Sequence, residues 1–351
     1  MPSEISFNSQ GEAEMMYFGA TPWHGHGTAL DAPATTAEAI NAAHLDWRVE
    51  MEPVYRRNQA GQEIVIPNQR AIVRADNGKD LGMVTNKYQT IQNTDAFQFY
   101  DEIIGMGDAI IHSAGALRDG KVVYLQAKLK DVQAEIVSGD MVEGYMLLST
   151  SHDGSLALQV RPTLMRVICW NTFQAALSQR RNSSNVVTIR HTGSIHDKAV
   201  KAREALGLTK QYFYQVVEGV NRLASRSFGD NQMESFANTL LRRGKEFDDS
   251  EKARPHAYTE EDFICLMDLF YNGKGQDLKG VQNTAWAALN AVTEFVDYHQ
   301  RVGHGGLRDA DDRRQQRAWF GKGVSYKERA WNLLHNHTFI NGIPSELIAV
   351  N

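Results

Sequence analysis

The chain has 351 residues, of which 42% are hydrophobic and 23% are charged, and its formal net charge at pH 7 is −5. This composition is that of an ordinary globular protein with enough apolar material for two domains or one large one, and its acidic balance excludes a histone-like coat on DNA. The two cysteines, Cys169 and Cys265, are too few for a disulfide framework or a four-cysteine zinc site.

The first half of the chain predicts β-strands with a few short helices between them. Apolar residues at helical spacing predict helices over residues 36–45 and 93–104. The run Asp76-Asn77-Gly78 predicts a hairpin turn between strands, because Asn-Gly tolerates a positive φ. The predicted strands are residues 47–55, 70–75, 81–84, 122–129, 145–150, 156–161, 167–169 and 186–191.

After Gly193 the apolar residues follow steps of three and four, which predict one helix of about 30 residues, roughly 45 Å long. Its apolar seam is formed by Ile195, Ala199, Ala202, Leu206, Phe213, Val216, Val220 and Leu223. A seam of this kind packs against another helix, in the same chain or in a second subunit. Further helices are predicted over residues 231–243, 259–271, 281–300 and 325–334.

Together these elements predict an α+β fold with two domains. A curved antiparallel β-sheet with helices forms residues 1–192, and a helical domain that begins with the long helix forms residues 193–351. No apolar run approaches the roughly 20 residues that span a bilayer. Residues 1–10 lack the basic and apolar regions of a signal peptide. We therefore expect a cytoplasmic protein without membrane contact.

Positive charge gathers in one part of this acidic chain, residues 161–203, which we call the basic stretch. It holds eight basic residues and a single acid, Asp197. Charge segregated in this way typically faces an anion, and nucleic acid is the obvious long polyanion; the alternative is a solvated loop and helix face. The expected contacts to phosphates and bases are Arg161, Arg166, Arg180, Arg181, Arg190, His191, Lys198 and Lys201, with Trp170 and Phe173 placed to stack on bases.

Catalytic patterns are weaker than the charge pattern. His24 and His26 could reach one metal ion, but no carboxylate or cysteine joins them at ligand spacing. Asp108 or Asp119 followed by Gln126-Ala127-Lys128 is only weakly similar to the pattern of metal-dependent nucleases. The Gly-x-Ser-x-Gly pattern of a nucleophile elbow is absent from the chain. The candidate side chains for a hydrolase are His24, His152, Asp153, Cys169 and His191. We expect no metal and no cofactor.

Five segments form a series along the chain. They are residues 22–28 around Pro22-Trp23-His24-Gly25, residues 151–155, Arg166-Val167-Ile168-Cys169 with Asn171-Thr172, residues 189–193, and Asn290-Ala291-Val292-Thr293-Glu294. Taken together, they resemble a family carried by phages and plasmids and described only as a domain of unknown function, although His26 stands where an aliphatic residue is expected. The resemblance implies a setting in mobile genetic elements within a bacterial host cell, hence replication, recombination or host takeover. It brings no catalytic residues.

The outline is also similar to single-strand annealing proteins of the phage Red beta type, which combine a curved sheet, a long helix and a basic groove and assemble into rings or filaments. This similarity is one of fold alone. The sequence therefore favours a non-enzymatic, homo-oligomeric protein that binds or anneals single-stranded DNA. Two alternatives stay open: a metal-dependent nuclease or other hydrolase, and a phage protein that binds a host protein.

Overall fold

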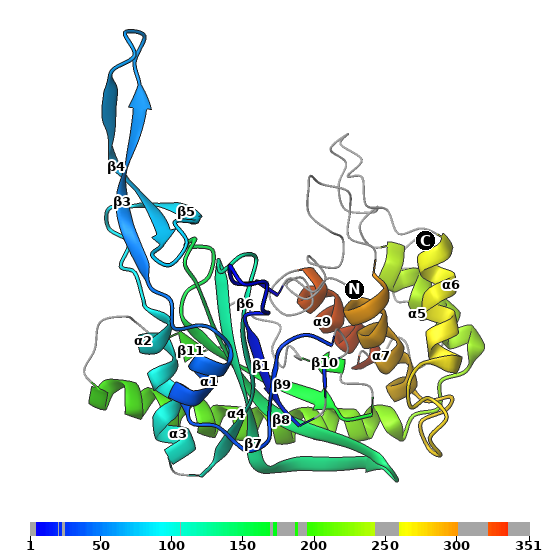
Figure 1. Ribbon diagram of the computed structural model, residues 1–351. Coiled ribbons are helices and arrows are strands. Elements are labelled where there is room, and N and C mark those ends of the chain that lie inside the picture. The colour runs from blue at the N-terminus through cyan, green and yellow to red at the C-terminus, as the bar shows by residue number, and fades with distance from the viewer. Residues whose placement is uncertain are drawn as a thin grey trace. The chain divides into compact units, whose positions relative to one another are not determined.

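The computed structural model describes residues 5–19, 21–22, 25–105, 107–168, 171–173, 187–188, 195–242, 260–300 and 322–335. Over these residues the chain forms two β-sheets together with helices that precede, interrupt and follow them (Figure 1). The predicted α+β class is confirmed.

The larger sheet has eight strands among the described residues, in the order β10-β9-β8-β7-β6-β1-β2, with β11 also paired to β9. The pairs β1–β6, β6–β7, β9–β10 and β9–β11 are antiparallel, whereas β1 and β2 are parallel, so the sheet is mixed. The strands are β1 (Met15–Phe18), β2 (Thr28–Leu30), β6 (Ala109–Leu117), β7 (Val122–Val137), β8 (Asp140–Ser151), β9 (Gln159–Arg166), β10 (Asn171–Phe173) and β11 (Val187–Thr188).

The smaller sheet is an antiparallel meander of β3 (Val49–Arg57), β4 (Glu63–Arg74) and β5 (Asp80–Thr85). Its β4–β5 turn is the predicted Asn-Gly turn: Gly78 has φ +68°, and the Asn77 side chain accepts a hydrogen bond from the Lys79 amide at 3.0 Å. The turn residues therefore determine this hairpin locally, as expected from the sequence.

Short helices cover part of the larger sheet. Helix α1 (Thr36–Ala42) begins at a capping box, in which Thr35 and Glu38 satisfy each other's backbone amides. The helix predicted over residues 93–104 forms three consecutive pieces, which are α2 (Asn93–Phe97), the 3-10 turn η1 (Gln98–Tyr100) and α3 (Asp101–Gly105). Helices α1 and α3 both contact β6, and the Tyr100 hydroxyl donates to the Met146 carbonyl at 2.9 Å.

Helix α4 (Ile195–Ala224) has the predicted length of 30 residues. Phe213 and Val216 of its seam are fully buried. A Cβ added to Gly144 of β8 would lie 3.1 Å from the Phe213 ring, so part of the seam is covered by the sheet. A helix covers another part, because Gly219 closely approaches Trp331 of α9 (Lys322–His335). The expected partner helix therefore shares this seam with a β-sheet.

The remaining helices are α5 (Asp230–Arg242), α6 (Glu260–Asn272), α7 (Ala285–Glu294) with its π-helical extension η2 (Phe295–His299), and α9. Helix α7 is buried along its whole length and contacts both α6 and α9. The Tyr326 hydroxyl of α9 donates to the Leu240 carbonyl of α5 at 3.1 Å. No described helix combines the length and the apolar character that crossing a lipid bilayer requires.

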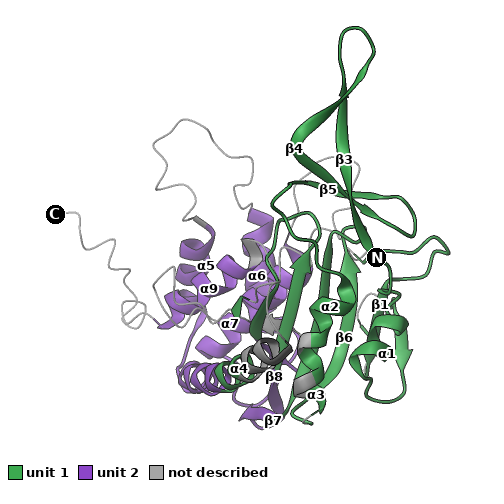
Figure 2. Cartoon of the chain, turned by 90° about the vertical axis from the view of Figure 1, so that its left-hand side faces the viewer, with its two compact units in different colours: residues 1–131, 145–162, 184–210 green, residues 132–144, 163–183, 211–351 purple. Residues whose placement is uncertain are grey.

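The chain forms two compact units, each assembled from three segments (Figure 2). Unit 1 comprises residues 1–131, 145–162 and 184–210, and unit 2 comprises residues 132–144, 163–183 and 211–351. Strands β7, β8 and β9 and helix α4 contribute residues to both units. The division into successive domains at residue 192 stays a prediction.

Candidate nucleic-acid interface

The basic stretch begins on strand β9 and ends on helix α4. Strand β10 pairs with residues 164–166 of β9, and β11 pairs with residues 159–160 of the same strand. These two short strands flank residues 174–186, which contain Arg180 and Arg181. Both of these described strands therefore pair with the strand that carries Arg161.

Arg161 is half-buried on β9. Its Nη2 donates to the Gln159 side chain at 3.3 Å, and the Gln159 amide donates in turn to the Ser149 hydroxyl at 3.4 Å. Because residues two apart on a strand share one face, Gln159 supports the guanidinium from its own side of the sheet. Such support orients an arginine whose fork suits a phosphate.

Arg166 corrects the expectation that all the arginines of the basic stretch meet phosphates. It is 3% exposed, and its Nε and Nη2 donate to the two carboxylate oxygens of Asp140 at 2.7 and 2.9 Å. It also donates to the carbonyls of Lys274 and Gly275 at 2.9 and 3.0 Å. An arginine so enclosed would leave a buried carboxylate uncompensated if it turned to a ligand. Arg166 therefore holds unit 2 together.

Arg161 and Arg166 also differ in the face of the sheet to which they point. They lie five residues apart on β9, and an odd spacing on a regular strand directs two side chains to opposite faces. The described part of the basic stretch thus presents one arginine, Arg161, as a candidate contact.

The other predicted contacts fall beyond what the structure describes in full. Phe173 lies on β10, and Lys198 and Lys201 lie on α4, where only the backbone is described. The residues outside the described parts of the chain are Trp170, Arg180, Arg181, Arg190 and His191. Their roles stay predictions.

His152, one residue of the hydrolase set, is a buried structural histidine in unit 1. It is 1% exposed, and its Nε2 lies 2.9 Å from Oδ1 of Asn93, which donates through Nδ2 to the Leu45 carbonyl at 2.9 Å. Its ring packs edge-on against Trp47. Burial lowers the pKa of His152 to about 4, so the ring is neutral and a poor general base at pH 7.

Asp153, the neighbour of His152 in the sequence, bonds to Ser155 and Arg118. Asp153 accepts a hydrogen bond from the Ser155 amide at 2.9 Å and pairs with Arg118 at 3.6 Å. Burial alone would raise the pKa of Asp153, but the hydrogen bonds of Ser155 and Ser151 and the nearby Arg118 hold it below its ordinary value. The carboxylate is thus held charged by its own turn. His24, Cys169 and His191, the other members of the set, lie outside the described residues.

The described residues contain no cluster of metal-binding side chains that would support the metal hypotheses. No group of three or more histidine, cysteine, aspartate or glutamate side chains in this part of the chain is placed to hold an ion. Asp119 pairs with Lys79 and Asp108 with Lys210, each at 3.1 Å, and Gln126 is buried against Ser113. His26 packs edge-on against Phe7, and His24 lies outside the described residues.

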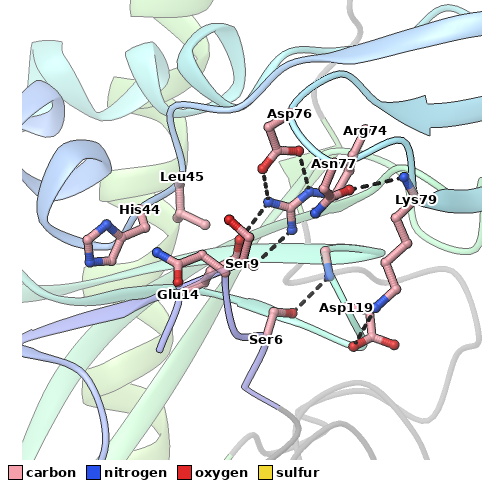
Figure 3. A network of polar contacts seen from close by, with 12 residues as sticks. Ser6, Ser9, Glu14, His44, Leu45, Arg74, Asp76, Asn77, Lys79 and Asp119 are labelled. Carbon is pink, nitrogen blue, oxygen red and sulfur yellow. Dashed lines mark hydrogen bonds and ion pairs between the residues drawn. The ribbon is translucent and has the colours of Figure 1, made fainter. Parts of the chain in front are cut away.

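A second buried arginine, Arg74 at the end of β4, was not expected from the sequence. Its guanidinium forms a bidentate pair with the fully buried Glu14 at 2.6 and 3.0 Å, and it donates to Asp76 at 2.7 and 3.0 Å (Figure 3). It also stacks over Trp47, 4.1 Å from the ring centroid. The cluster fastens the root of the β3–β4 hairpin to the segment that enters β1. Glu14 and Arg74 are 60 residues apart, so no local pattern reveals the pair.

Unit 2 contains a small cavity beside Arg166. It is lined by Val142, Leu164, Arg166, Val220, Trp286, Asn290 and Thr293, and its volume is about 10 Å³, enough for one water molecule. The Asn290 Nδ2 is buried without a hydrogen-bond partner among the described residues. A bound water would satisfy this donor, whereas a substrate would not fit.

Comparison with known proteins supplies one match. A family model described as "Domain of unknown function (DUF932)" matches residues 80–319. Comparisons with curated proteins and with solved structures found no match.

Proposed function

Because the chain belongs to the DUF932 family, whose description names no activity, we propose a function from the chain's own residues. The protein binds single-stranded nucleic acid, in particular single-stranded DNA, without catalysing a reaction. The phosphate contacts are Arg161, Arg180, Arg181, Arg190, Lys198 and Lys201. His191 is a further nucleic-acid contact, and Trp170 or Phe173 stacks on bases.

The segregation of charge carries this proposal. Eight cations and one acid occupy residues 161–203 of a chain whose net charge is −5. Arg166 is neutralised by Asp140, so the proposed surface does not include it. Strands β10 and β11, which precede and follow Arg180 and Arg181 in the sequence, both pair with β9, the strand that carries Arg161.

The wider setting is part of the proposal. Annealing of complementary strands, assembly into an oligomer and action in phage or plasmid replication within a bacterial cytoplasm accord with a surface that holds one strand extended and leaves the edges of its bases open for pairing. The hydrolase hypothesis has less support, since one residue of its set, His152, is buried against Asn93 and Trp47.

Salt dependence of binding tests the proposal. Fluorescence anisotropy with a labelled oligothymidylate would give the binding constant at several salt concentrations. Each neutralised phosphate contributes about −0.7 to the slope of log K against log salt, so six contacts predict a slope of about −4. A flat response, or no binding at low salt, rejects the proposal.

A variant pair locates the surface. Arg180→Ala/Arg181→Ala is expected to weaken binding and to reduce the magnitude of the slope by about 1.4, the loss of two contacts. The matched control, Arg313→Ala/Arg314→Ala, removes an adjacent arginine pair outside the basic stretch and leaves the slope unchanged. Equal effects of the two variants would mean that the basic stretch is not the binding surface. Annealing of complementary oligonucleotides in the same buffer separates annealing from simple binding.

A further inference from the structure

The chain contains three Asn-Gly pairs, at residues 77–78, 272–273 and 341–342, and in the first two the next residue is a lysine. The structure describes these two, and the third lies outside the described residues. An Asn-Gly pair is chemically reactive, because glycine has no side chain to keep its backbone nitrogen away from the asparagine side chain. Since both described sites read Asn-Gly-Lys, a difference between their reactivities comes mainly from the fold.

The first site lies open to solvent in the turn between β4 and β5. Asn77 and Gly78 are both exposed, and a Cβ added to Gly78 would have no atom within 4 Å beyond its chain neighbours. The Asn77 Oδ1 accepts a hydrogen bond from the Lys79 amide at 3.0 Å (Figure 3). This bond bends the side chain back along the main chain past Gly78 and draws electrons away from Cγ. A bond from the Gly78 amide to the Arg74 carbonyl, at 2.9 Å, must open before that amide reacts.

The second site, at the end of α6, is closed. Gly273 is buried, and a Cβ added there would lie 2.5 Å from the Leu269 carbonyl oxygen and 2.8 Å from Oε2 of Glu294. The Asn272 Nδ2 donates to Asp268 at 2.7 Å, and the Gly273 amide donates to the Leu269 carbonyl at 3.1 Å. Reaction at Asn272 therefore requires the end of the helix to open first, and local opening costs free energy.

We propose that Asn77 is a site of spontaneous deamidation. The backbone nitrogen of Gly78 loses its proton and attacks Cγ of Asn77, the bond from Cγ to the side-chain nitrogen breaks, and ammonia leaves. The product is a five-membered succinimide ring. Water then opens the ring at either carbonyl and gives aspartate or isoaspartate at position 77. The net reaction consumes one water, releases one ammonia and transfers no electrons.

Isoaspartate at this position changes the turn that holds Arg74. Two backbone bonds close the turn, from the Gly78 amide to the Arg74 carbonyl at 2.9 Å and from the Arg74 amide to the Lys79 carbonyl at 3.0 Å. The same turn supplies Asp76 to the Arg74 guanidinium. Isoaspartate inserts the Cβ atom of residue 77 into the main chain, so these bonds no longer match and Arg74 is loosened. Aspartate only adds a charge. This inference does not depend on the nucleic-acid proposal.

Ageing of the full-length chain at neutral pH tests the site. Peptide mapping by mass spectrometry follows both Asn-Gly-Lys sites in one sample, and chromatography separates aspartate from isoaspartate products. One hydrogen bond more must open at Asn272 and its glycine must leave a buried position, so Asn77 is expected to react at least about tenfold faster. In urea the two rates are expected to converge. Equal rates in the folded chain, or faster reaction at Asn272, overturn the inference.

Two variants test the effect on the turn. Asn77→Ser keeps a side-chain oxygen that can accept from the Lys79 amide but has no amide to lose, so its unfolding temperature is expected to stay constant during ageing. Fresh Asn77→Asp carries the charge without the extra main-chain atom and is expected to unfold like the fresh wild-type chain. The aged wild-type chain is expected to unfold at a lower temperature as isoaspartate accumulates. Isoaspartate without such a shift, or the same shift in aged Asn77→Ser or in fresh Asn77→Asp, overturns the loosening of Arg74.

Discussion

Each of the two units buries an arginine beside a tryptophan, but the two arginines have different partners. In unit 1, Arg74 meets two carboxylates, the buried Glu14 and the half-exposed Asp76, and lies 4.1 Å from the Trp47 ring. In unit 2, Arg166 meets one carboxylate, Asp140, and two carbonyls, while Trp286 donates its indole N–H to Asp140 at 2.8 Å.

The two clusters differ in which polar groups lose their partner when the arginine is removed. Glu14 can take up a proton, since burial raises its pKa despite the opposing effect of Arg74, and Asp76 keeps contact with solvent. Asp140 is fully buried, and the two carbonyls that face Arg166 would lose their donor. Loss of Arg166 therefore strips two buried backbone carbonyls of a donor as well as a buried carboxylate of its cation, whereas the second carboxylate beside Arg74, Asp76, keeps contact with solvent.

The largest effect is expected from Arg166→Met. Removing one partner of a buried ion pair costs about 3–5 kcal/mol, and the two orphaned carbonyls place this variant at the upper end. Urea unfolding would measure the loss, and hydrogen exchange would locate it in unit 2. The double variant Arg166→Met/Asp140→Asn is the control, expected to recover part of the stability because it removes the unpaired charge. A loss below about 1 kcal/mol would contradict the buried pair.

Arg74→Met is expected to cost less, about 3 kcal/mol at pH 7. Its cost should shrink as the pH falls toward 5, because Glu14 then takes up a proton and no longer needs a cation. Unfolding at the two pH values would measure this change. A cost that stays the same at both pH values would contradict the role of Glu14.

His152, which shares Trp47 with Arg74, predicts acid sensitivity in unit 1. Its folded pKa of about 4 lies below the ordinary 6.5, so the unfolded chain binds the proton more readily. The stabilisation is complete above pH 6.5 and disappears as the pH falls toward 4, a change on the order of 3 kcal/mol. The slope of unfolding free energy against pH between 4 and 6.5 should flatten in His152→Gln. An unchanged slope would assign the acid sensitivity to other groups.

The smallest effects concern the helix caps. Thr35 caps α1 in unit 1 and Thr284 caps α7 in unit 2, and the Thr284 hydroxyl also donates to the Val281 carbonyl at 2.6 Å. Thr35→Ala is expected to cost about 1 kcal/mol and Thr284→Ala about 2 kcal/mol, because the second site is buried. Thermal unfolding of both variants would rank them, and the reverse order would contradict the role of burial.

Sequence patterns predicted the turns and helices that are determined by residues close together in the chain. The Asp76-Asn77-Gly78 turn and the 30-residue helix α4 form as expected, since turn chemistry and apolar spacing act over a few residues. Strand β6 was missed because most of its residues are buried and its sequence, AIIHSAGAL, shows no regular alternation of apolar and polar residues.

The candidate site shows the limit of sequence reasoning more clearly. Arg166 and Arg161 look alike in the sequence, yet Arg166 is buried and Arg161 is only half-buried. The partners of Arg166 lie 26 and 109 residues away, at Asp140 and Gly275, and no local pattern indicates such pairing. Charge counting thus found a region rich in cations without showing which of them are already neutralised.

The division of each unit into three segments has a consequence for synthesis of the chain. Unit 1 lacks its last segment until residue 210 has left the ribosome, and by then residues 132–144 and 163–183 of unit 2 have already emerged. Those two segments must wait for residues 211–351 before their own unit can close. Nascent chains halted just after residue 210 has emerged from the ribosome would therefore hold the whole of unit 1 and the unprotected beginnings of unit 2, the stage at which a chaperone matters most.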